Sequence, residues 1–123
     1  MASMDHEEAV ALLTKRRDAW LNQDLDSYLS LFAEDFVFIA GGVEQSRGRV
    51  ALAEAVRRNY ELFDPVSWEF HEIAVRGQNI LAEWTVTLEE KATGAQRSMQ
   101  AMFICEIQDG LAMCVREYRA GGT

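Results

Sequence analysis

The residues that could carry chemistry in this sequence are a glutamate and a few arginines set among apolar side chains. Glu117 and Arg119 lie two residues apart in a strand-like segment, so their side chains share one face of that strand. A carboxylate that faces an apolar interior must be paired, hydrogen-bonded or neutral, because burying it alone costs several kcal/mol. In an aromatic pocket its pKa rises toward the range useful for general acid–base catalysis. The alternative is a structural ion pair between Glu117 and an arginine.

The last predicted hairpin decides which way Glu117 points. A three-residue loop at 108–110 pairs Ala101 with Glu117 and Met99 with Arg119, and it keeps the apolar faces of the two strands together. The other pairs that this loop predicts are Ile107 with Leu111, Cys105 with Met113, and Phe103 with Val115. A two-residue turn would instead pair the two cysteines. We therefore favour the longer loop, with Glu117 facing inward and the cysteines on opposite faces of the sheet.

The first predicted helix places an arginine near the same interior. Its apolar face is defined by Leu13 and Trp20, and both Arg16 and Arg17 flank the centre of that face. We choose Arg17, four residues after Leu13 and three before Trp20, as the inward side chain. There it would pair with Glu117 or hold a substrate oxygen or carboxylate. The alternative is an arginine whose charged end reaches solvent.

Aromatic residues are the predicted walls of the pocket. Each of them alone favours a place in the core over a ligand contact, but together they are too bulky for a small sheet to pack without a cavity. The set is Trp20, Phe36, Phe38, Phe63, Trp68, Phe70, Trp84 and Phe103. Asn59 could add a polar group one helical turn before Phe63, and His71 is predicted to face outward. No spacing matches a metal site, a nucleophile elbow or a phosphate-binding loop, so we expect no metal and no cofactor.

Three helices and a run of strands would position these residues. A capping box at Asp5 and Glu8 predicts the first helix, Asp24 begins a short second helix that runs through Phe32, and Gly48 begins a third that stops at Asp64-Pro65. A strand is expected at 36–40. The period then changes from 3.6 to 2, which predicts strands at about 66–76, 79–91, 96–107 and 111–119. Helices followed by antiparallel strands predict an α+β fold with the helices on one side of a sheet.

Bulk properties narrow the class of protein further. The chain has 123 residues, 49% of them hydrophobic, which is ordinary for one globular domain covering 1–123. The net charge of −8 argues against binding to nucleic acid or to anionic membranes. No apolar run approaches the ~20 residues that span a bilayer, and the start lacks the layout of a secretory signal. With only two cysteines, a cytoplasmic location is expected.

The order of these elements resembles the nuclear transport factor 2-like superfamily, which includes ketosteroid isomerase, limonene-epoxide hydrolase and the SnoaL-like polyketide cyclases. The resemblance covers nearly the whole chain, and it is strongest at 19–26, 31–35 and 109–118. It implies a cone-shaped α+β barrel, with three N-terminal helices in the concave face of a strongly curved, mostly antiparallel sheet. It also implies a small hydrophobic organic ligand. The inner positions that it implies are Arg17, Trp20, Asn59, Phe63, Trp68, Trp84, Phe103 and Arg119. It further implies a homodimer through the outer sheet face, at Thr85, Thr87, Met102, Ile104 and Tyr118.

The active sites known in this superfamily do not carry over residue by residue. Where ketosteroid isomerase has a tyrosine and two aspartates, this chain has Arg16, Ala40 and Ala101. The places of four catalytic residues of limonene-epoxide hydrolase hold Phe38, Ala40, Trp84 and Val86. Only Glu117 matches, at the aspartate of the last strand. The favoured hairpin, inferred without the resemblance, turns the same residue inward.

Three functional hypotheses follow. The first is an isomerase, lyase, cyclase or hydrolase that acts without a cofactor on a hydrophobic, oxygenated substrate. In it Glu117 is the general acid or base, and Arg17 or Arg119 holds that carboxylate or the developing negative charge. The second is a ligand-binding or dimerisation module without turnover, and the third is a protein-interaction module. Substrate identity is not predicted by the sequence.

Overall fold

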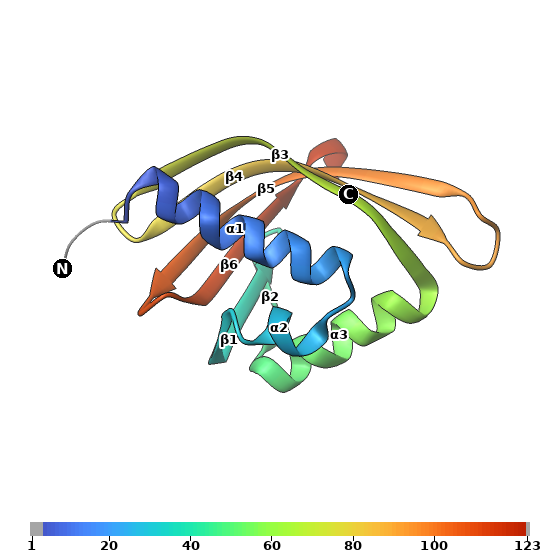
Figure 1. Cartoon of the computed structure of the whole chain (residues 1–123), viewed down its shortest axis with the longest axis horizontal. Helices are drawn as coiled ribbons and strands as arrows, with labels where there is room; N and C mark the ends of the chain where they lie inside the picture. Colours follow the sequence, from blue (N-terminus) through green and yellow to red (C-terminus); the bar gives the residue numbers. More distant parts are fainter. Residues whose placement is uncertain (1–3, 123) are drawn as a thin grey trace.

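Three helices precede most of the sheet along the chain. The computed structural model describes residues 4–122, with α1 at His6–Leu21, α2 at Leu25–Leu29, α3 at Arg49–Leu62 and a short 3-10 turn, η1, at Ala120–Gly122 (Figure 1). The predicted cap forms, since Oδ1 of Asp5 accepts a hydrogen bond from the backbone N–H of Glu8 at 2.8 Å. Asp24 caps α2 in the same way through Ser27. These caps satisfy N–H groups that the first helical turn leaves without partners.

Six strands form one open sheet in the order β2-β1-β6-β5-β4-β3. Their bounds are β1 Phe32–Ala40, β2 Val43–Arg47, β3 Phe63–Arg76, β4 Asn79–Glu90, β5 Gln96–Gln108 and β6 Leu111–Arg119. Among these strands only the neighbours β1 and β6 are parallel, and the other four pairs are antiparallel. The predicted α+β class and the mostly antiparallel sheet are therefore confirmed, although the sheet does not close into a complete barrel.

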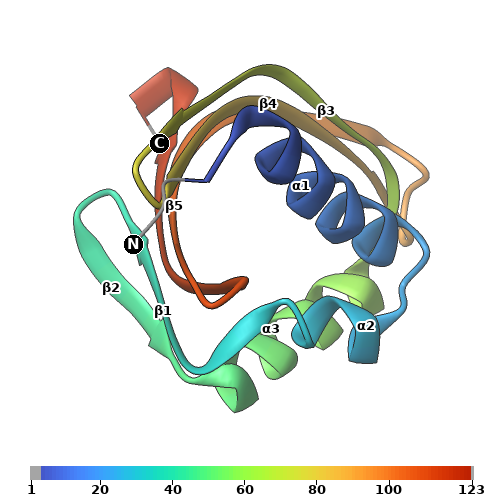
Figure 2. The same ribbon diagram turned by 60° about the vertical axis from the view of Figure 1, so that its left-hand side comes forward.

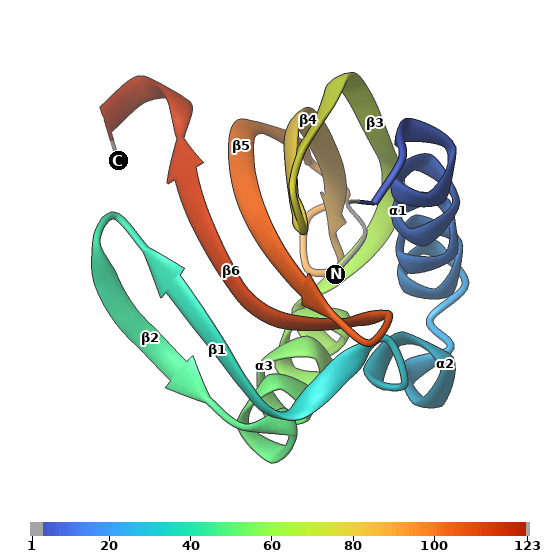
Figure 3. The same cartoon turned by 90° about the vertical axis from the view of Figure 1, so that its left-hand side faces the viewer.

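The sheet curls strongly, and its concave face turns toward the helices (Figures 2 and 3). Helix α1 packs against β3, whereas α3 contacts β1 and β2 near one edge and β3 at the other. Helix α3 therefore bridges the two free edges of the open sheet. This arrangement leaves the inner face of β6, which carries Glu117, directed toward the space between the sheet and the helices.

The interior is dominated by large apolar side chains from both the sheet and the segment after α2. Those with almost no exposed surface are Phe32, Phe36, Ile80, Phe103 and Val115. Complete burial of a side chain of this size contributes about 1.5–3 kcal/mol to stability. The space inside the curved sheet is therefore filled by packed side chains for most of its length.

Several element boundaries differ from those predicted. Helix α2 ends at Leu29 and β1 begins at Phe32, four residues earlier than expected. Strand β2 was not predicted because its residues are mostly polar and exposed, as befits an edge strand. Helix α3 ends at Leu62, just before the predicted stop at Asp64-Pro65, and β3 begins at Phe63, earlier than the expected residue 66. Strand β3 therefore contains Pro65, which an edge strand tolerates although proline cannot donate a ladder hydrogen bond.

The β5–β6 hairpin corrects the predicted register but not the face of Glu117. The turn is a two-residue one, with φ of 53° at Asp109 and 78° at Gly110, values typical of a type I′ turn. Met113 then has no partner on β5, because Ile107 pairs with Ala112 and Glu106 pairs with Cys114. This β-bulge adds one residue to β6. Beyond it, the residues of β6 that face inward are the same ones that a three-residue loop would have turned inward.

The observed pairs of this hairpin are Phe103 with Glu117 and Ala101 with Arg119. The predicted partners of Glu117 and Arg119, which were Ala101 and Met99, are therefore wrong by two residues. The predicted inward direction of Glu117 is correct, since it is the one charged residue among the buried side chains of the described part of the chain. No helix in residues 4–122 is both long enough and apolar enough to cross a bilayer.

Candidate functional site

Glu117 lies on β6 and is 8% exposed. Nε of Arg119 donates a hydrogen bond to Oε2 of Glu117 at 2.9 Å, and the Arg119 side chain remains half-exposed. Side chains two residues apart on a strand share a face, which brings the two groups together. The carboxylate is thus paired with Arg119, and Phe103 is its cross-strand neighbour on β5.

A cleft of about 600 Å³ opens beside this ion pair. Its walls come from β1, β2, α3 and the end of β6. They consist of Phe38, Ala40, Gly41, Gln45, Ser46, Ala55, Glu117, Tyr118 and Arg119. The cleft is mixed in character, because apolar residues of β1 lie beside a charged pair on the adjacent strand β6. It can admit a small organic molecule, since ligand pockets commonly measure about 300–1,000 Å³.

The inward arginine of α1 is Arg16, and the prediction that Arg17 faces the interior is wrong. Arg17 lies on the outer side of the helix, where its Nε bonds to Oδ1 of Asp18 at 3.2 Å. The prediction located the apolar face from Leu13 and Trp20 but gave no weight to Ala9, which has no exposed surface. Adding Ala9, seven residues before Arg16, moves the centre of the buried face from Arg17 toward Arg16.

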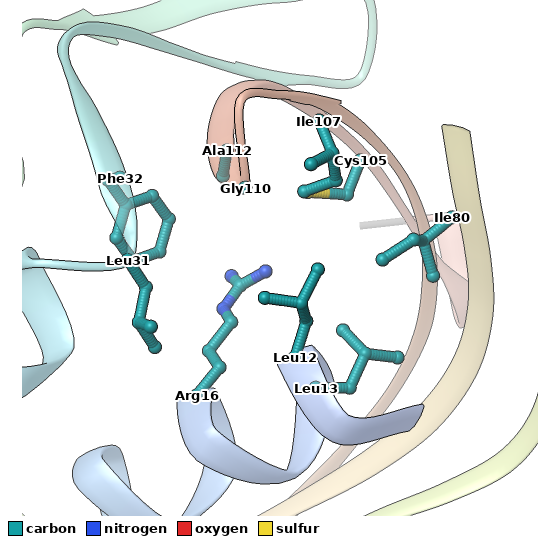
Figure 4. Close-up of a pocket in the computed structure, with 10 residues that line it drawn as sticks. All are labelled: Leu12, Leu13, Arg16, Leu31, Phe32, Ile80, Cys105, Ile107, Gly110 and Ala112. Atoms are coloured by element: carbon teal, nitrogen blue, oxygen red, sulfur yellow. The ribbon is translucent and has the colours of Figure 1, made fainter. Parts of the chain in front are cut away.

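Arg16 is surrounded by aromatic rings. Its guanidinium carbon lies 4.8 Å from the ring centre of Phe103 and 5.2 Å from those of Phe32 and Trp68. The residue as a whole keeps some exposed surface, but its Nε and Nη1 atoms are buried and have no hydrogen-bond partner among the described residues. Figure 4 shows the side chain rising from α1 toward Phe32 and the β5–β6 hairpin. Ring faces carry negative charge density, so these contacts offset part of the cost of burying the cation.

The ionisation of the interior groups follows from this burial. For Arg16, burial acts to lower the pKa, but Tyr28, Cys105 and Glu117 act in the opposite direction, and the net pKa is raised above its usual value. Burial also raises the pKa of the Cys105 thiol to about 11. At neutral pH the interior therefore contains a charged guanidinium and an uncharged thiol.

The predicted aromatic residues divide between the core and the cleft. Trp20, Trp68, Trp84 and Phe103 are buried and form a continuous series, with ring-centre distances of 5.5, 5.6 and 6.0 Å. Phe38 instead lines the cleft with Glu117. Phe103 connects the two groups, because it contacts Arg16 and pairs with Glu117.

Asn59 and Phe63 are half-buried on and just after α3, and neither is among the residues that line the cleft. His71 is exposed, as predicted, and its Nε2 lies 2.7 Å from Oγ1 of Thr85. No group of three metal-ligating residue types comes together within residues 4–122.

Two residues near the site were missed. Tyr60 donates a hydrogen bond from its hydroxyl to the backbone oxygen of Trp20 at 2.8 Å and joins α3 to α1. Tyr28, buried on α2, acts to raise the pKa of Arg16. Nothing in the spacing of these two tyrosines indicates the contacts that they make.

Comparisons with solved structures agree with this architecture. The chain is similar to an LEH-like epoxide hydrolase from M. tuberculosis, with 23% identity over 92% of this chain and 83% of that one and a TM-score of 0.79. It is similar to a candidate isomerase from Bacillus subtilis, with 20% identity, 94% and 89% coverage and a TM-score of 0.81. A candidate polyketide cyclase from Xanthomonas campestris pv. campestris gives 22% identity, 91% and 90% coverage and a TM-score of 0.73. At these identities the likeness establishes the fold.

Sequence comparison identifies the family. No curated protein matches the chain. The family model of the SnoaL-like domain, however, matches residues 13–114, which is most of the chain. The resemblance seen in the sequence is thereby confirmed. This chain belongs to the SnoaL-like domain family of the nuclear transport factor 2-like superfamily.

Proposed function

We propose that this protein is a cofactor-independent enzyme that acts on a small, hydrophobic, oxygenated molecule, with Glu117 as the general acid or base. One observation carries the proposal. A buried carboxylate, bonded to a single guanidinium, lines a ligand-sized cleft together with Phe38 and Ala40 of the neighbouring strand β1. A substrate with an apolar body and one oxygen could place that oxygen near Arg119 and its reacting atom near Glu117.

Glu117 and Arg119 would have different roles in the reaction because they carry opposite charges. Glu117 would take a proton from a carbon next to a carbonyl group, or from an attacking water molecule. Arg119 would stabilise the negative charge that develops on the substrate oxygen, since its planar group can bond more than one acceptor. General acid–base catalysis by a positioned side chain typically contributes 10²–10⁴-fold in rate. The similar structures support a small-molecule reaction because they include an epoxide hydrolase and candidates for an isomerase and a polyketide cyclase.

The test needs an assay that detects proton transfer whatever product is formed. A panel of hydrophobic ketones and epoxides is incubated with the protein in D₂O or in ¹⁸O-labelled water, and mass spectrometry records isotope uptake. We expect at least one compound to gain deuterium or ¹⁸O, and Glu117→Gln to lower that rate at least ~100-fold while binding persists. Glu106→Gln is the matched control, because Glu106 is an exposed glutamate on β5. Full activity in Glu117→Gln contradicts the acid–base role.

A ligand-binding module without turnover is the second candidate. It is favoured by the bond between Arg119 and Glu117, which occupies one carboxylate oxygen. This hypothesis predicts saturable binding of panel compounds to the cleft with no isotope uptake by any of them. If Phe38→Ala weakens the binding of these compounds and no isotope exchange is detected, the result favours the ligand-binding module over the enzyme.

We propose further that two copies associate through the outer sheet face in the cytoplasm. Met102 and Tyr118 are paired across β5 and β6, and they are 37% and 46% exposed. Their strand positions place them on the opposite face of the sheet from Phe103 and Glu117, and Tyr118 also reaches the edge of the cleft. The two free thiols, Cys105 and Cys114, are compatible with a reducing compartment.

A further inference from the structure

Charge within the cone does not balance. Arg16 brings one positive charge into the interior, and the carboxylate that acts on its pKa is that of Glu117. That carboxylate is already bonded by Arg119 at 2.9 Å. The Cys105 thiol, whose pKa burial raises to about 11, supplies no negative charge at neutral pH. One positive charge is therefore left without an ionic partner, and a buried charge is costly unless it is paired.

Hydrogen bonding shows the same imbalance. Nε and Nη1 of Arg16 are buried donors without a partner among the described residues. Every unpartnered buried side-chain atom in that part of the chain is a nitrogen donor; the others belong to Arg49, Trp68 and Trp84. Ring faces compensate charge but accept N–H bonds only weakly. The interior therefore has an excess of donors and requires an acceptor.

A small hollow lies beside this guanidinium. Its volume is about 20 Å³, which is room for one particle the size of a water molecule. It is walled mainly by apolar side chains of α1, the start of β1 and the β5–β6 hairpin (Figure 4). The lining residues are Leu12, Leu13, Arg16, Leu31, Phe32, Ile80, Cys105, Ile107, Gly110 and Ala112. None of them lines the cleft at Glu117, so the two spaces are distinct.

We infer that Arg16 binds a single-atom monovalent anion, of the size of chloride or bromide, in this hollow. The ion accepts a hydrogen bond from one of the two N–H groups at Nε and Nη1, which point to different sides of the guanidinium, and it neutralises the charge that Glu117 does not. A water molecule would satisfy that donor but would leave the charge uncompensated. A carboxylate or phosphate has several heavy atoms and exceeds the available volume. The inference is independent of the reaction proposed for Glu117.

The test measures bromide binding at constant ionic strength. Sodium bromide replaces sodium gluconate, whose anion is too large for the hollow, while melting temperature and tryptophan fluorescence are recorded. Trp68 contacts the Arg16 guanidinium, and all three tryptophans are at most 8% exposed, so bromide in bulk solution has little access to them. We expect saturable fluorescence quenching in the millimolar range, reversal by chloride, and a rise of a few degrees in melting temperature.

Two neighbouring arginines give a matched pair of variants. Arg17→Met removes a surface charge of the same helix and is expected to keep the full bromide response. Arg16→Met is expected to abolish both the quenching and the rise in melting temperature. If Arg16→Met does not fold, Arg16→Lys is measured instead. It keeps the charge but loses the planar guanidinium, and it should weaken bromide binding about tenfold. A wild-type protein without a saturable response, or a response unchanged in the Arg16 variants, overturns the inference.

Discussion

The guanidinium of Arg16 is a buried charge surrounded mainly by aromatic side chains. Three rings, those of Phe32, Trp68 and Phe103, stabilise its charge where a carboxylate partner would otherwise be expected. Cation–π contacts contribute about 2 kcal/mol or more each when they are desolvated. They reduce the electrostatic cost of burial without replacing the lost hydrogen bonds to water. The interior around Arg16 therefore carries a positive charge that favours anions, whereas the cleft at Glu117 contains both a positive and a negative side chain.

The two cysteines should differ sharply in reactivity. Cys105 is buried with a pKa raised to about 11, whereas Cys114 is only half-buried, although burial raises its pKa as well. Because the thiolate is the reactive form, a raised pKa lowers the reactive fraction at pH 8, and alkylation should accelerate as pH increases. We expect iodoacetamide to modify one thiol per native chain at pH 8 and two after unfolding, measured by intact mass.

Single serine variants assign the reactive thiol. Cys114→Ser should eliminate native labelling, and Cys105→Ser should preserve it. Native labelling of Cys105 at the rate of Cys114 would mean that the hollow beside Arg16 opens readily to solvent.

Helices α1 and α3 are joined by one hydrogen bond whose contribution can be measured. The Tyr60 hydroxyl donates to the backbone oxygen of Trp20, and its pKa is raised, mainly by burial and also by Tyr28 and Asp24. We expect Tyr60→Phe to lower the free energy of unfolding by about 1 kcal/mol, because a buried backbone acceptor loses its donor. Urea denaturation at pH 7 measures this difference.

The pH dependence gives a second measure of the same bond. Folded Tyr60 retains its proton above the ordinary tyrosine pKa of about 10, while the unfolded chain loses it. Stability from this group is therefore complete below pH 10 and declines as pH rises further. The wild-type protein should lose more stability than Tyr60→Phe between pH 9 and 11. Equal alkaline losses in the two proteins would show that the hydroxyl is not buried as described.

The elements that sequence predicted well are those specified by local chemistry. Capping residues predicted where α1 begins, and alternation predicted β4 and β5 closely. The inward face of Glu117 was also correct, but for a different reason than the one given. A loop length was inferred where the chain has a type I′ turn and a bulge at Met113. Both solutions keep apolar residues inside, so hydrophobic pattern alone does not distinguish between them.

The parts that were not predicted depend on contacts distant in sequence. The choice between Arg16 and Arg17 depended on a small rotation of the buried helical face, because that face includes Ala9, a residue with little hydrophobic signal. Strand β2 forms because it pairs with β1, and its own composition does not predict a strand. The cleft beside Glu117 requires the relative placement of β1, β2, α3 and β6, which no single segment encodes.

At the scale of the whole molecule, curvature separates two surfaces of one sheet. The concave face carries the aromatic core and Glu117, and the convex face carries exposed side chains such as Met102 and Tyr118. A helix covers part of the concave face, but none of the helices α1 to α3 packs on the convex one (Figures 2 and 3). The chain also has a net charge of −8, so association of two copies must overcome mutual repulsion.

The uncovered convex face and the negative net charge together lead to a prediction about the proposed dimer. Tyr118→Glu places a charge on the convex face and should shift the mass measured by light scattering from dimer to monomer, because a buried unpaired carboxylate is strongly unfavourable. Val50→Glu is the control: Val50 is 75% exposed on α3, away from that face, so its added charge should leave the dimer intact. Since salt screens the repulsion between two acidic chains, the wild-type dimer should tighten between about 0.01 and 0.15 M salt. A monomeric wild-type protein at both salt concentrations, or equal dissociation of both variants, rules out the convex face as the interface and leaves Met102 and Tyr118 as ordinary surface residues.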